Sequence, residues 1–242
     1  MTEAPPAAAA PNLFARLVGV VFSPKATMER LVASPRVLGA LLVGGMIVGL
    51  STGLPQLTES GKQAAIDAQV QQTERFTGRQ VSEEQLSLME RTMPYRAWGT
   101  IIATPFFTAI GCLLFAGLYF VIFNVVLGGT AEFKQVMAVI SHSLFITALG
   151  VAAGAPIQYL QGTANPMGPF TLGALLPMLD ETSFLARMLG FINVFGLWGT
   201  LVTAIGLGVL YRRKTSSIAV WLYALGAVFA AIGATVVGFF TR

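Results

Sequence analysis

The sequence predicts an all-α polytopic membrane protein with five transmembrane helices and short interfacial helices. Only 11% of its 242 residues are charged and 55% are hydrophobic, whereas soluble domains carry about 25% charged residues. Two stretches near the C-terminus, 188–210 and 216–241, contain no charged residue. Each is long enough to cross a bilayer, which takes about 20 apolar residues as a helix. Neither has a polar face to turn toward water, so both are expected to lie in lipid.

The N-terminal part of the chain leads into the membrane through short helices. Residues 1–11 form an Ala/Pro tract that we expect to be a disordered tail. Residues 12–22 are apolar but too short to span, which predicts an interfacial helix. Two Ser-Pro pairs, at 23–24 and 34–35, each place a capping hydroxyl before a proline at the first helical position. They predict a short helix between them and a first span after the second pair.

The rest of the chain, 12–242, is expected to form one membrane domain. Its predicted spans are residues 37–54, 97–127, 136–155, 188–210 and 216–240. Pro105 is expected to kink the second span, or to separate it from an interfacial entry. Residues 157–179 are apolar but rich in proline and glycine, so they cannot form a straight span. We expect a membrane-hugging loop there, with a short helix near 170–176.

Residues 55–96 are the one strongly polar segment and are predicted to form an extracytoplasmic loop. Five positive and six negative side chains favour a solvated cap over a charged receptor surface, although a receptor role stays open. Ser82 and Gln85 have the spacing of a capping box, which predicts the start of a helix in this loop. We expect Pro94 to end that helix.

The basic residues predict the orientation. Arg212, Arg213 and Lys214 form a basic turn between the last two spans. Because cations near span ends favour the cytoplasmic side, we expect the N-terminus in the cytoplasm and the C-terminus outside, in the inner membrane of a bacterium. The cations lie at the ends of apolar runs rather than on one soluble face, so nucleic acid is not an expected partner.

Small residues recur at helical spacing in two of the spans. They are Gly45, Gly49 and Gly53 in the first span and Gly150 and Gly154 in the third. Such ridges let a second helix approach closely. We expect helix packing within the chain, with a homo-oligomer face as the alternative.

Three polar side chains within the predicted spans, Asn124, His142 and Asn193, are candidates for an intramembrane polar cluster. No Asp, Glu, Lys or Arg falls inside a predicted span, which argues against an ion-coupled transporter. His142 is the sole histidine and Cys112 the sole cysteine, so neither a metal nor another cofactor is expected. We expect His142 to donate or accept an interhelical hydrogen bond, to Asn193 or Asn124. A catalytic or pH-sensing role is the alternative.

Three stretches together resemble the Yip family, in its prokaryotic branch. They are Phe22-Ser23-Pro24-Lys25-Ala26-Thr27-Met28, the run 127–136 (LGGTAEFKQV), and the last hairpin from Leu179-Asp180 through Trp198 and Tyr211 to Trp221. Yip proteins are five-span membrane proteins known for binding Rab (Ypt) GTPases. The resemblance implies membrane organisation or trafficking through protein contacts, without an enzymatic site. Rab GTPases belong to eukaryotes, so a bacterial relative would need another partner.

The leading hypothesis is therefore a non-enzymatic scaffold whose partners are membrane lipids and an unknown protein or a second copy of the chain. The first alternative is a permease or transporter subunit that moves an uncharged or lipid-like molecule past Asn124, His142 and Asn193. A cavity around those three would favour it. The second alternative is an intramembrane enzyme that uses His142.

Overall fold

The prediction of an all-helical membrane protein is confirmed. The computed structural model describes residues 12–240 except 166, 177, 181 and 182, so the predicted tail at 1–11 lies outside the described residues. Five of its helices are long and apolar enough to cross a bilayer. The helices are α1 (Leu13–Phe22), α2 (Pro24–Ala33), α3 (Leu38–Gly53), the 3₁₀ turn η1 (Pro55–Leu57), α4 (Glu59–Thr77), α5 (Glu83–Phe120), the π-helical η2 (Val121–Val126), α6 (Phe133–Gln161), α7 (Phe184–Gly190), α8 (Val194–Tyr211) and α9 (Thr215–Phe240).

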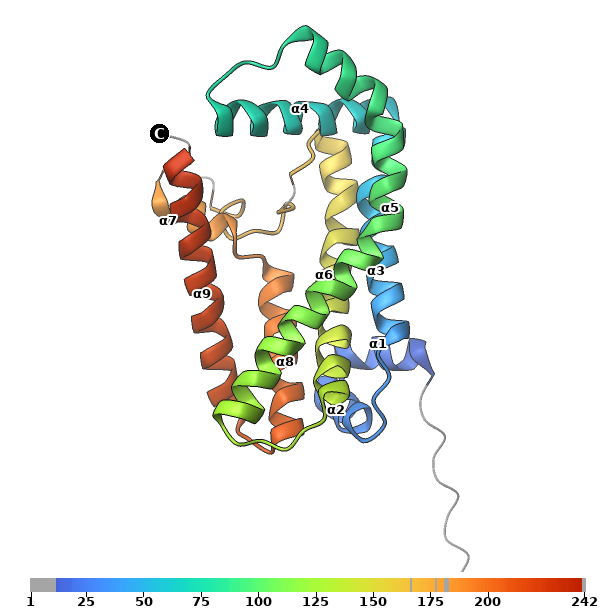
Figure 1. Ribbon diagram of the computed structural model, residues 1–242, viewed down its shortest axis with the longest axis vertical. Coiled ribbons are helices and arrows are strands. Elements are labelled where there is room, and N and C mark those ends of the chain that lie inside the picture. Colours follow the sequence, from blue (N-terminus) through green and yellow to red (C-terminus); the bar gives the residue numbers. More distant parts are fainter. Residues whose placement is uncertain (1–11, 166, 177, 181–182, 241–242) are drawn as a thin grey trace, which may run out of the picture.

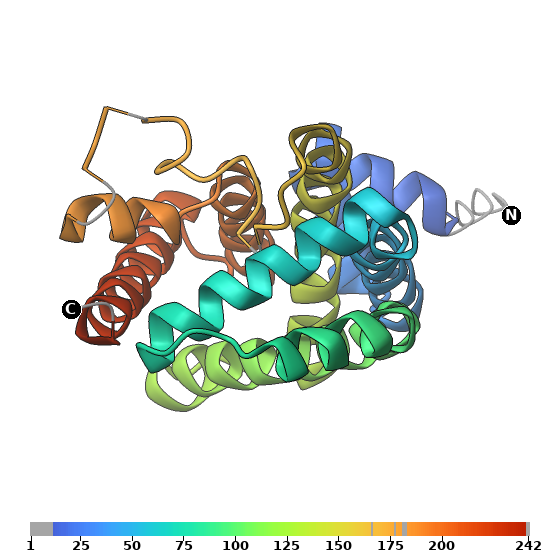
Figure 2. The same cartoon turned by 90° about the horizontal axis from the view of Figure 1, so that it is seen from above.

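The spans α3, α5, α6, α8 and α9 run between two layers of transverse helices (Figure 1). Helices α1 and α2 lie at one end of the bundle, and α4 runs across the other end (Figure 2). Helix α6 is the most buried of the spans and packs against α3, α5 and α8. The chain enters at the end that holds α1, and α9 finishes at the end that holds α4, as an odd number of crossings requires.

The second span is much longer than the predicted 97–127. Helix α5 begins at the predicted capping box, where Ser82 Oγ accepts from the Gln85 backbone N–H (3.3 Å) and Gln85 Oε1 accepts from that of Ser82 (3.0 Å). It then continues through Pro94 and Pro105 into η2, so the prediction that Pro94 ends this helix is wrong. A proline removes one backbone hydrogen bond without forbidding the next turn. Figure 1 shows α5 changing direction along its course.

Two other local predictions also differ from the structure. The second Ser-Pro pair, at 34–35, does not open a helix directly, because residues 35–37 have no regular structure and α3 begins only at Leu38. No helix forms at 170–176 in the described residues. Helix α7 lies further on, mostly before the predicted fourth span, and overlaps only the first three residues of that span. The chain breaks after α7 because Asn193 caps a new helix, with its Oδ1 accepting from the Phe195 backbone N–H at 2.9 Å.

Candidate functional site

The end of the bundle that holds α1 and α2 gathers four separate segments of the chain. Besides these two helices it contains the turn between η2 and α6 and the turn between α8 and α9 (Figure 1). Arg213 Nη2 donates to the Leu127 carbonyl oxygen at 3.2 Å, which joins the two turns. Gln135 Nε2 donates to the Val32 carbonyl oxygen at 3.1 Å, which joins α6 to α2. These contacts make one surface of segments that are distant in sequence.

This surface, which we call the basic end, is strongly positive. In the part of the chain that the structure describes, its cations are Arg16, Lys25, Arg30, Arg36, Lys134, Arg212, Arg213 and Lys214, and its acids are Glu29 and Glu132. Among the described residues the opposite end is nearly balanced. Its cations are Lys62, Arg75, Arg79, Arg91, Arg96 and Arg187, and its acids are Glu59, Asp67, Glu74, Glu83, Glu84, Glu90 and Asp180. The charge of the described residues is therefore polarised along the bundle axis, with the excess of positive charge at the basic end.

Arg16 is the one cation of the basic end whose side chain is buried, and sequence reasoning missed its special position. It is 9% exposed, and its Nε and Nη1 atoms are buried without a hydrogen-bond partner. Burial, followed by the charge of Arg36, lowers the pKa of Arg16 below its usual range. The spacing in the sequence could have indicated this burial, because Arg16 shares a helical face with the apolar Val20. In the structure Leu17 and Val20 are both buried beside it.

His142 lies fully buried on α6, but its hydrogen bonds stay within its own helix. The distance from its Nδ1 to the Ala138 carbonyl oxygen is 2.9 Å, and the carbonyl can only accept, so Nδ1 donates. Ser141 Oγ lies 3.3 Å from the same nitrogen. The Nε2 atom is buried without a partner. The expected interhelical bond to Asn193 or Asn124 is therefore not formed.

Asn193 directly precedes the first residue of α8, whereas Asn124, on η2, lies near the last residue of α8. The three candidate polar residues therefore do not form one cluster. Asn193 caps the start of α8 and donates from Nδ2 to the Met167 carbonyl oxygen at 3.3 Å. Asn124 donates to the Ala131 carbonyl oxygen at 2.7 Å, and its neighbour Phe123 stacks on Tyr211 at the far end of α8. Helix α8 has 18 residues and is therefore about 27 Å long, which is too far for Asn124 and Asn193 to contact each other.

The first glycine ridge lies against α5. A Cβ at Gly45 would sit 2.6 Å from the Pro105 Cα, and one at Gly49 would sit 2.9 Å from the Ile101 carbonyl oxygen. A Cβ at Gly53 would approach the Ala97 carbonyl oxygen to 2.9 Å. Since α5 covers this ridge, the structure uses it for packing within one chain.

The second ridge supports the connection into α8. A Cβ at Gly150 would sit 2.5 Å from Cγ of Phe195, and one at Gly154 would sit 2.8 Å from Cδ of Pro169. The ring of Phe195 packs on that of Phe170 with their centroids 5.2 Å apart. The glycines of α6 therefore make room for the start of α8 and the loop before it.

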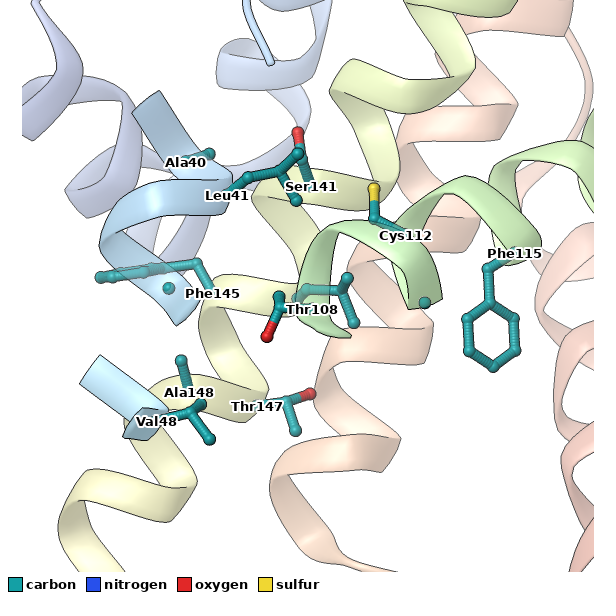
Figure 3. A pocket seen from close by; sticks show the side chains of 13 residues that line it. Ala40, Leu41, Val48, Thr108, Cys112, Phe115, Ser141, Phe145, Thr147 and Ala148 are labelled. Carbon is teal, nitrogen blue, oxygen red and sulfur yellow. The ribbon is translucent and has the colours of Figure 1, made fainter. Parts of the chain in front are cut away.

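Two adjoining cavities lie along the groove between α3 and α6. The outer cavity, of about 510 Å³, lies among α3, α4, α6 and the loop before α7, and Asn193 and Gln158 line it. The inner cavity, of about 180 Å³, is apolar and contains Cys112 and Ser141 in its wall (Figure 3). Val48 and Thr147 line both. Neither His142 nor Asn124 lines either cavity. Neither cavity therefore surrounds Asn124, His142 and Asn193 together, as transport past all three would require.

The fold and its charged end define an integral membrane protein of five helical spans with a basic surface at one end. The Yip1 domain model matches residues 18–238, so this chain belongs to the Yip1 domain family. The resemblance seen in the sequence is thereby confirmed at the level of the family. No curated protein and no solved structure matches the chain significantly.

Proposed function

We propose that this Yip1-domain protein is a non-enzymatic membrane-organising scaffold of the prokaryotic branch of its family. It lies in the inner membrane of a bacterium, with the N-terminus in the cytoplasm and the C-terminus outside. Its basic end binds anionic lipid headgroups and a soluble protein with an acidic surface. The observation that carries this proposal is the collection, among the described residues, of eight cations and two acids at one end of the bundle.

The position of α1 supports contact between the basic end and lipid headgroups. Phe14, Val18 and Phe22 follow one another at four-residue spacing on this helix, and they are 76%, 38% and 80% exposed. A helix with an exposed apolar face lies at the boundary of acyl chains and headgroups. The basic turn at Arg212–Lys214 lies at the same end, and its three side chains are exposed.

Crosslinking in the native membrane tests the scaffold proposal. A photoreactive amino acid at Arg30 or Arg213 samples the basic end, and one at Arg79 or Glu84 samples the opposite end as a control. All four positions are exposed. We expect anionic lipid and one recurring soluble protein to be captured at the basic end and not at the control positions. Identical capture at both ends would contradict the proposal.

His142 has a structural role under this proposal. Changing His142→Ala removes a fully buried side chain and its bond to Ala138, so we expect the free energy of unfolding to fall by about 1–3 kcal/mol. Capture of lipid and protein at the basic end should stay at the wild-type level. Ser143→Ala is the matched control, because Ser143 Oγ makes a similar bond to its own helix, to the Val139 carbonyl oxygen at 2.9 Å. A normally folded His142→Ala protein without partner capture would argue for a catalytic or sensing role.

The outer cavity favours a second candidate function, as a permease or transporter subunit for an uncharged or lipid-like molecule. Its volume of about 510 Å³ lies within the range of small-molecule sites, and its wall mixes apolar residues with Gln158 and Asn193. Thr147 stands where the two cavities meet.

Thr147→Phe would block the junction between the two cavities. If the cavities carry a lipid-like molecule, this variant should lower equilibrium binding of a fluorescent monoacylglycerol about ten-fold, because the ring displaces its acyl chain. Val151→Ala, which changes the outer cavity wall without filling it, is the control. Unchanged binding in Thr147→Phe would remove the transport candidate while leaving the scaffold proposal standing.

A further inference from the structure

We propose that Arg16, assisted by Arg36, binds a phosphate group, and that in the membrane this is the phosphodiester of a phospholipid headgroup. The site deepens the proposed function, because it rests on the basic end lying among headgroups and names the lipid chemistry that it recognises. It differs from the diffuse attraction of the exposed turns, since it requires one buried guanidinium.

The burial of Arg16 without a partner is the first observation. The residue is 9% exposed, and neither Nε nor Nη1 makes a hydrogen bond. Buried donors in folded proteins are nearly always paired, and a buried charge without a counter-charge is strongly unfavourable. An acceptor that carries negative charge would satisfy both requirements at once.

The neighbours of Arg16 do not supply that acceptor. Among the described residues no carboxylate pairs with Arg16, and the charge that acts on it most is that of Arg36, another cation. Both described acids of the basic end, Glu29 and Glu132, are exposed. His142 lies within electrostatic range on α6, but no hydrogen bond joins it to Arg16. The unpaired donors of Arg16, with the charge of Arg36 acting on them, form an incomplete anion site.

The position of the site selects phosphate. The exposed apolar side chains of α1 place this helix at the lipid boundary, so the inward cation of the same helix lies at headgroup depth. A guanidinium is planar, keeps its charge and presents five donors, which suits two oxygens of one phosphate. Exposed Arg36 can reach the same group from the linker between α2 and α3.

Native mass spectrometry of the full-length protein in detergent tests the site. The probes are short-chain phosphatidylglycerol, the matching uncharged diacylglycerol, and inorganic phosphate alone. We expect one phosphatidylglycerol to bind wild-type protein with preference over diacylglycerol, and Arg16→Gln to weaken its binding about ten-fold. Arg79→Gln at the opposite end should leave binding unchanged. Saturable binding of inorganic phosphate alone, lost in Arg16→Gln, would equally support the site and assign free phosphate as its ligand.

Thermal unfolding without lipid separates loss of the site from loss of the fold. Arg16→Gln removes an unpaired buried charge, so its unfolding temperature in lipid-free detergent should equal or exceed that of wild type. Phosphatidylglycerol should then raise the temperature for wild type but much less for the variant. If Arg16→Gln does not fold, Arg36→Gln should still weaken phosphatidylglycerol binding several-fold. If the folded Arg16 and Arg36 variants bind phosphatidylglycerol as tightly as wild type, the phosphate site is overturned. The scaffold proposal would still stand, because it depends on the exposed turns.

Discussion

Replacing Arg212, Arg213 and Lys214 together by Gln is expected to weaken association with anionic vesicles about a hundred-fold. Each cation near an anionic surface contributes about 1 kcal/mol, and three contribute about 3 kcal/mol, which is about two orders of magnitude in affinity. All three side chains are exposed, so the change should leave the packed core intact. The measurement is co-flotation of the protein, held in zwitterionic nanodiscs, with vesicles that contain phosphatidylglycerol.

A matched charge change at the opposite end controls this result. The control variant replaces Lys62, Arg75 and Arg79 by Gln. It removes the same charge from a region where acids balance the cations, so its vesicle association should stay at the wild-type level. Raising the salt to about 1 M shortens the screening length to about 3 Å and should abolish association of the wild type. Equal loss in both triple variants would show that net charge alone matters, and would contradict a specific role for the basic end.

The double variant Gly45→Ala/Gly49→Ala is expected to lower the free energy of unfolding by about 3 kcal/mol. The two new methyl groups would lie 2.6 Å from the Pro105 Cα and 2.9 Å from the Ile101 carbonyl oxygen. Both obstacles are backbone atoms of α5, which cannot move aside as a flexible side chain can. The helices α3 and α5 must therefore separate along the whole ridge, and packing is lost.

Gly44 provides a control next to the first of these positions. A Cβ at Gly44 meets nothing within 4 Å, because this glycine borders the inner cavity. Gly44→Ala should therefore be neutral, or should stabilise the protein by up to about 1 kcal/mol through better helix propensity. Unfolding in mixed micelles with increasing SDS measures all variants. Equal stability of Gly44→Ala and the double variant would mean that α3 and α5 do not pack on this ridge.

Charge-free length was sufficient to predict the number of spans, because hydrocarbon excludes charge and every span needs about 20 residues. It could not predict where helices break inside an apolar stretch. The predicted span at 188–210 was expected to be continuous, but the helix is interrupted at 191–193, where Asn193 caps a new helix. Pro94 led to the opposite error, because a helix end was predicted there and α5 continues through it.

The candidate site was harder to predict than the fold, since it depends on which way side chains point. The basic turn at Arg212–Lys214 was evident from composition, but the unpaired burial of Arg16 follows from α1 packing its inner face on the bundle. His142 could be identified as buried, yet its partner could not. Its Nδ1 bonds to the carbonyl one turn earlier, and no sequence pattern distinguishes that choice from an interhelical bond.

Accessibility of single cysteines in intact cells tests the central claim that five spans hold the basic end in the cytoplasm. Cys112 is buried and is first replaced by Ala. Arg79→Cys and Arg213→Cys then report the two ends through labelling with a membrane-impermeant maleimide. The account predicts labelling of Arg79→Cys in intact spheroplasts and of Arg213→Cys only after lysis. Labelling of Arg213→Cys before lysis, or of both positions alike, would contradict it.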